Sequence, residues 1–85
     1  MRTFNRYGLL VRKIRLESGN SLDDASIKMG VPKRDIVGVE DRGWRPSATF
    51  DANFRRAFPQ SAGMNERLNR FFEEVNKPQF LRKAR

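Results

Sequence analysis

The side chains best suited to binding chemistry gather in residues 30–47, GVPKRDIVGVEDRGWRPS. Lys33 and Arg34 follow a proline, and Arg42 and Arg45 flank a Gly-Trp pair. Lysine and arginine donate hydrogen bonds to phosphate oxygens and to the O6 and N7 acceptors of guanine, and arginine can make two parallel bonds. This stretch therefore favours contact with a polyanion over catalysis.

The charge of the whole chain points the same way. Its 85 residues include 18 Lys and Arg against 10 Asp and Glu, a formal net charge of +8. The basic residues run along the entire sequence, and a compact basic domain attracts polyanions because phosphate contacts release condensed counterions. Ribosomal and membrane-surface proteins share such a balance, so charge alone favours nucleic acid without singling it out.

Residue types that commonly perform catalysis or hold metals are scarce. The sequence has no His and no Cys, so the commonest general base, the usual nucleophile–base pairs and the zinc ligands are missing. The acids form no close cluster beyond the adjacent pairs Asp23–Asp24, Glu40–Asp41 and Glu73–Glu74. Adjacent carboxylates on a helix usually form a solvated face. We expect no enzymatic activity, no metal, no cofactor and no small-molecule ligand.

The N-terminal segment MRTFNRYGLLVRKIR gives no sign of a membrane protein. Arginine interrupts its apolar run after a few residues, which is too short for a signal-peptide core or a membrane span. We expect a soluble, intracellular protein of one small domain, with no membrane contact.

Amphipathic helices must position the basic side chains. Apolar residues at i, i+3, i+4 and i+7 predict a first helix over 6–18, which Gly19 stops. Ser21 is a good N-cap for a second helix, with Asp24 as its capping-box partner, and Gly30 ends that helix.

A third helix follows almost at once. Pro32 stands in its first turn, where the fixed backbone angle of proline suits helix entry. Ile36 and Val39 carry its buried face, and the helix extends to about Arg42. Two short helices joined by a tight, glycine-containing turn suggest a helix-turn-helix.

Two further helices complete an all-α, compact five-helix domain over residues 1–78. Ser47 caps the fourth helix, whose core stripe is Phe50, Phe54 and Phe58. The segment PQSAG breaks the chain before a fifth helix, which Pro78 ends. Residues 79–85 are expected to form a basic C-terminal tail.

The order and spacing of these pieces resemble the Cro/C1-type (XRE) helix-turn-helix family of small phage and bacterial regulators. The resemblance covers about residues 7–58, in the segments YGLLVRKIRLESG, SLDDASIKMGV, PKRDIVGVEDR and GWRPSATFDANFRRAF. It implies a lambda-repressor-like fold whose third helix enters the major groove of double-stranded DNA. It further implies a homodimeric repressor that binds a palindromic operator, in the cytoplasm of a bacterium or a phage-infected cell.

The resemblance also implies roles for individual residues. The positions that read base edges are Lys33, Arg34, Val37 and Gly38. The positions that contact the DNA backbone are Ser21, Arg42, Trp44 and Arg45. Arg15 and Glu40 match a buried ion pair that ties the first helix to the third.

Some of these positions have a second interpretation. Lys33 and Arg34 would otherwise be ordinary solvated charges. Leu22 stands where the family often has a DNA-contacting Gln, and we expect it to join the core instead. Gly38 permits either close approach to DNA or tight packing within the protein. Trp44 either donates to phosphate or caps the core between the third and fourth helices.

The fifth helix predicts a partner surface. Phe71 and Phe72 are adjacent and lie on different faces, and a domain this small has little room to bury both. The expected dimer interface consists of Leu68, Phe71, Phe72 and Val75. Two other functions stay open: the antitoxin of a toxin–antitoxin pair, and a basic RNA- or ribosome-associated adaptor.

Overall fold

The computed structural model describes residues 5–77, and this part of the chain is all-helical. Its helices are α1 (Arg6–Glu17), α2 (Leu22–Met29), α3 (Lys33–Asp41), α4 (Ala48–Ala57) and α5 (Ala62–Asn76). The expected all-α, five-helix fold is confirmed. The predicted basic tail, residues 79–85, lies outside the described residues.

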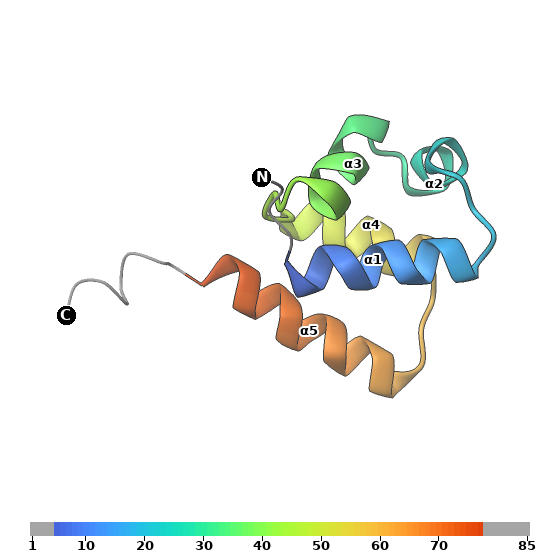
Figure 1. Ribbon diagram of the computed structural model, residues 1–85. Helices are drawn as coiled ribbons and strands as arrows, with labels where there is room; N and C mark the ends of the chain where they lie inside the picture. The colour runs from blue at the N-terminus through green and yellow to red at the C-terminus, as the bar shows by residue number, and fades with distance from the viewer. Residues whose placement is uncertain (1–4, 78–85) are drawn as a thin grey trace.

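Helix α1 packs against α3 on one side and α5 on the other (Figure 1). The short helix α2 contacts both α3 and α4. Every helix contributes to one core, whose fully buried large side chains are Tyr7, Val11, Met29, Ile36, Phe54 and Leu68. The phenylalanine stripe of α4 is buried as expected, and Leu22 packs against the core.

Side chains placed directly before the helices cap four of them: Asn5, Ser21, Ser47 and Ser61. The capping box of Ser21 and Asp24 is confirmed. The cap at Ser61, whose hydroxyl accepts from the Met64 N–H over 3.2 Å, starts α5 inside the segment that was expected to break the chain. Pro32 is the N-cap of α3 and not a first-turn residue as expected, because its backbone is extended.

Gly8 sets how closely α1 approaches α3. A Cβ atom at this position would overlap the backbone carbonyl of Val39. Since backbone atoms cannot move aside as the end of a flexible side chain can, only glycine permits this crossing distance. The close approach fixes the C-terminal half of α3 against α1.

The expected dimer strip on α5 belongs largely to the core of its own chain. Leu68 is completely buried, so its assignment to an interface is wrong. The ring of Phe72 meets Tyr7 edge-on at 5.8 Å between centroids, and Val75 is half-buried against the same core. The large apolar side chains that are exposed lie elsewhere: Leu9, Leu16, Ile27 and Trp44.

Within residues 5–77, no helix combines the length and the apolar character that crossing a bilayer requires.

Candidate nucleic-acid interface

A buried ion pair holds α3 on α1. Arg15 donates through Nε and Nη2 to the two carboxylate oxygens of Glu40, over 2.8 and 2.9 Å, and through Nη1 to the Asn20 carbonyl over 2.9 Å. The hydrogen bond to Glu40 raises the pKa of Arg15, although burial opposes this, so the guanidinium stays charged. The expected pair is confirmed, and its two-bond geometry fixes the orientation of α3.

The opposite face of α3 carries exposed cations. Lys33 and Arg34 are exposed, and Val37 is half-buried. The Lys33 amine lies 3.3 Å from a carboxylate oxygen of Asp23 on α2, an exposed pair that contributes little to stability. Arg34 forms no ion pair with any residue between 5 and 77. Within this part of the chain, no carboxylate competes with an external acceptor for the guanidinium of Arg34.

These side chains line a groove of about 500 Å³ together with Arg42 and Trp44. We call it the α3 groove; its lining residues are Lys33, Arg34, Val37, Arg42 and Trp44. No carboxylate is among them, so the groove presents three cations beside an apolar wall. Such a surface suits a ligand that combines phosphate with flat or methylated groups.

Trp44 forms that wall because it stacks on Gly38. A Cβ atom at Gly38 would overlap the indole ring. The backbone carbonyl of Gly38 also accepts hydrogen bonds from the backbone N–H groups of Arg42 and Trp44, each over 3.0 Å. Gly43, with a φ of 69°, allows the chain to turn back so that the ring reaches α3.

This stack bears on the open interpretations of Gly38 and Trp44. Gly38 is buried beneath the indole, so its assignment to the base-reading surface is wrong and tight packing explains the glycine. Trp44 is 45% exposed, so nearly half of its surface lies outside the core. Its ring braces the loop against α3 and leaves its outer side open to solvent.

The remaining predicted backbone contacts lie apart from the α3 groove. Arg45 is exposed and lines a smaller cleft of about 210 Å³, whose lining also includes Asp35 and Pro46. Ser21 is exposed, but its hydroxyl accepts from the Asp24 N–H over 3.0 Å. The structure thus brings together Lys33, Arg34, Val37, Arg42 and Trp44 and leaves Ser21 and Arg45 outside their groove.

Several positioning residues were missed from the sequence. The Tyr7 hydroxyl donates to Asp51 over 2.7 Å, and Arg55 donates to the same carboxylate over 3.1 Å, which joins α1 to α4. Burial, with that hydrogen bond, raises the pKa of the Tyr7 hydroxyl. Asn20, whose carbonyl completes the Arg15 site, followed Gly19 in what seemed an ordinary loop. Only the glycine at position 8, in the first turn of an amphipathic helix, gave a signal that could have been used.

Neither a cluster of metal-binding side chains nor a matching known protein adds to the description of the site. Among residues 5–77, no three His, Cys, Asp or Glu side chains are placed to hold a metal ion together. In comparisons with known proteins, no protein family, curated protein or solved structure matches this chain. The resemblance to Cro/C1-type regulators therefore stays a prediction that depends on the residues quoted above.

Proposed function

We propose that this protein binds double-stranded DNA through α3 and regulates transcription by occupying an operator. The observation that carries the proposal is the α3 groove, in which exposed cations and an indole share one face of the helix. On the other face, Ile36 and Val39 are buried and Glu40 is paired with Arg15. A helix held this firmly can present its outer face to a ligand without reorganising.

The side chains on that face match the groups of the DNA major groove. Arg34, which has no ion pair to break among residues 5–77, would donate two hydrogen bonds to the O6 and N7 acceptors of one guanine. Val37 would contact a thymine methyl group. Lys33, Arg42 and the indole N–H of Trp44 would contact phosphate, and the net charge of +8 would increase the rate of association.

Few side chains remain to read bases once Gly38 is excluded. The proposal therefore includes two copies on a palindromic site, with recognition helices about 34 Å apart on adjacent turns. Occupancy of such a site excludes polymerase, so autorepression is the simplest mode of regulation. The contact between the copies would not use Leu68, which is buried.

Selection of binding sites from a random duplex pool tests this proposal. We expect an enriched motif of two inverted half-sites, with an affinity that falls as salt rises because phosphate contacts release counterions. Affinity that does not depend on sequence would refute operator reading. Tighter binding to structured RNA than to any selected duplex would favour the adaptor alternative instead.

A further inference from the structure

A second basic cleft lies between α1 and α5, the helix on the opposite side of α1 from α3 (Figure 1). Its volume is about 380 Å³. We call it the α1–α5 cleft, and its lining residues are Arg6, Leu9, Leu10, Lys13, Arg67 and Phe71. The proposed DNA contacts use none of these side chains.

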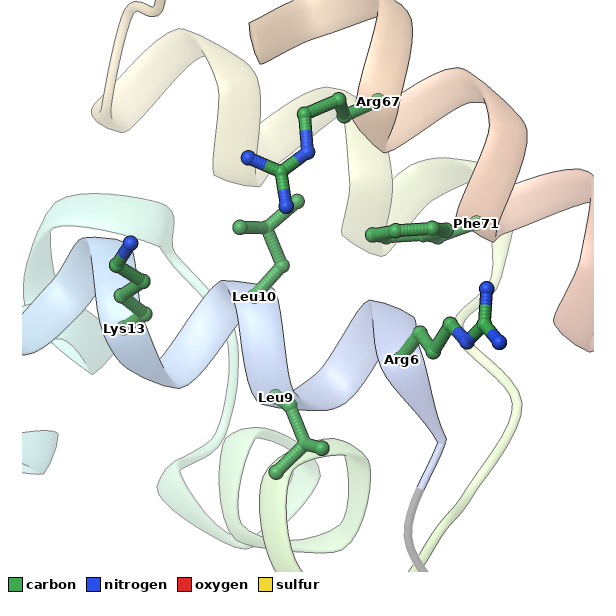
Figure 2. Close-up of a pocket in the computed structure, with 6 residues that line it drawn as sticks. All are labelled: Arg6, Leu9, Leu10, Lys13, Arg67 and Phe71. Carbon is green, nitrogen blue, oxygen red and sulfur yellow. The ribbon is translucent and has the colours of Figure 1, made fainter.

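The cleft is cationic, and no carboxylate lines it. The guanidinium carbons of Arg6 and Arg67 both lie 5.9 Å from the centroid of the Phe71 ring. Figure 2 shows Arg67 extending from α5 toward Leu10, with Phe71 between the two guanidinium groups. Three cations that share one small cleft repel each other, so an anion bound there would be stabilised by all of them.

The chain's own acids neutralise this charge only weakly. Arg6 lies 4.0 Å from Glu74 and Lys13 lies 3.9 Å from Glu17, with more than half of each side chain exposed. Exposed pairs at such distances are easily exchanged for another partner. Arg67 forms no ion pair within residues 5–77.

The floor of the cleft is apolar. Leu9 is 46% exposed although it lies beside the buried Leu10, and the ring of Phe71 is half-buried. Exposed apolar side chains gain free energy when an apolar group covers them. A ligand that fits the site must therefore carry a large apolar group together with negative charge.

We propose that the α1–α5 cleft binds an acidic segment of a partner protein in which carboxylates flank a large apolar side chain. The apolar side chain would cover the ring of Phe71, and the carboxylates would pair with Arg6, Lys13 and Arg67. This inference does not depend on DNA binding.

Other occupants fit the charge less well. A second copy meeting this surface about a twofold axis would place its three cations against the same three cations. The C-terminal sequence PQFLRKAR carries further cations and no acidic side chain. Nucleic acid would satisfy the cations but would leave the apolar floor facing a charged backbone.

Fluorescence anisotropy with synthetic peptides tests the proposal. The first probe is Asp-Glu-Leu-Phe-Glu-Asp with blocked ends, the second replaces Leu-Phe by Ser-Ser, and the third replaces the acids by lysines. We expect the first peptide to bind at least tenfold more tightly than the second, and the third not to bind. Equal affinity of the first two peptides, or no binding of the first at millimolar concentration, would overturn the proposal.

Matched charge reversals on α5 locate the site. Arg67→Glu should weaken binding of the first peptide at least tenfold, whereas Arg70→Glu, at an exposed position of α5 outside the cleft lining, should change it less than twofold. Circular dichroism confirms that each variant is folded, and Lys13→Glu replaces Arg67→Glu if that variant is not. Equal losses of peptide affinity in Arg67→Glu and Arg70→Glu would mean that net charge alone attracts the peptide, and would refute binding in the α1–α5 cleft.

The same two variants test whether nucleic acid or a second copy occupies the cleft instead. Arg67→Glu and Arg70→Glu should have equal affinity for selected duplex DNA and equal sedimentation behaviour. A specific loss of DNA affinity in Arg67→Glu would assign the cleft to nucleic acid. A specific loss of a dimer would assign it to a second copy. Either result would refute the proposal that an acidic partner segment occupies the cleft.

Discussion

The stack of Trp44 on Gly38 predicts that Gly38→Ala destabilises the protein when Trp44 is present and stabilises it when Trp44 is replaced by alanine. In a helix interior, alanine is more favourable than glycine by about 1 kcal/mol. At Gly38, however, the new methyl group would overlap the rigid indole ring. Gly38→Ala should therefore push the ring, and the loop that carries it, away from α3.

The magnitude follows from the contacts that are lost. Forcing a methyl group into a filled site costs about 1–3 kcal/mol. The 3.0 Å hydrogen bond from the backbone N–H of Trp44 to the Gly38 carbonyl contributes about 1 kcal/mol. After the gain in helix propensity, Gly38→Ala should destabilise the protein by about 1–3 kcal/mol. A Trp44→Ala background removes the indole atoms that the methyl group would overlap, so there the same change should stabilise by about 1 kcal/mol.

Urea unfolding of the four proteins of this cycle, followed by circular dichroism, measures both values and a coupling energy of about 2–4 kcal/mol. Trp44 is the single tryptophan, so its fluorescence should shift toward that of a solvated indole in Gly38→Ala. Gly63→Ala is the control, because a Cβ atom there meets no other atom within 4 Å, and it should not destabilise. Equal stabilisation by Gly38→Ala in both backgrounds would refute the stack.

Three further predictions concern the contacts that α1 makes with the other helices. Glu40→Gln leaves the buried Arg15 without its carboxylate and should cost about 3–5 kcal/mol in urea unfolding; a loss below about 1 kcal/mol would contradict a structural ion pair. Gly8→Ala should cost about 1–3 kcal/mol in the same assay, because the obstruction is backbone, and a stabilised variant would contradict the close crossing. The raised pKa of Tyr7 keeps its hydroxyl protonated in the folded state. The contribution of Tyr7 to stability should therefore be constant below about pH 10 and fall above it by up to about 1.4 kcal/mol per pH unit, because the unfolded state ionises. Tyrosinate absorbance, which only Tyr7 can produce, should then appear together with unfolding, and its appearance in folded protein would contradict this.

The helices were predictable because their signals are local. Apolar periodicity and the capping box at Ser21 depend on residues within one or two turns, so neither needs tertiary information. The pairing of Arg15 with Glu40 was predictable only through the resemblance, since the residues lie on different helices. The start of α5 was missed because the cap at Ser61 is surrounded by residues typical of a loop.

The details of the site depend on contacts that no local pattern encodes. Whether Gly38 faces DNA or protein was decided by where the loop at Gly43 carries the indole. The apolar stripe of α5 likewise predicted a buried face without specifying what buries it. Tyr7, far away in sequence, covers Phe72, so a strip that suggested a partner is largely used within the chain.

The central claim is that α3 reads DNA through Arg34. Its most direct test compares Arg34→Ala with Arg56→Ala, an equal loss of charge at an exposed position of α4 outside the α3 groove. Affinities are measured for the selected duplex and for every single-base variant of it. Arg34→Ala should cost about 1–3 kcal/mol and abolish discrimination at one symmetric position of both half-sites, whereas Arg56→Ala should preserve the whole pattern. A uniform loss of affinity in both variants, with discrimination intact, would contradict the claim.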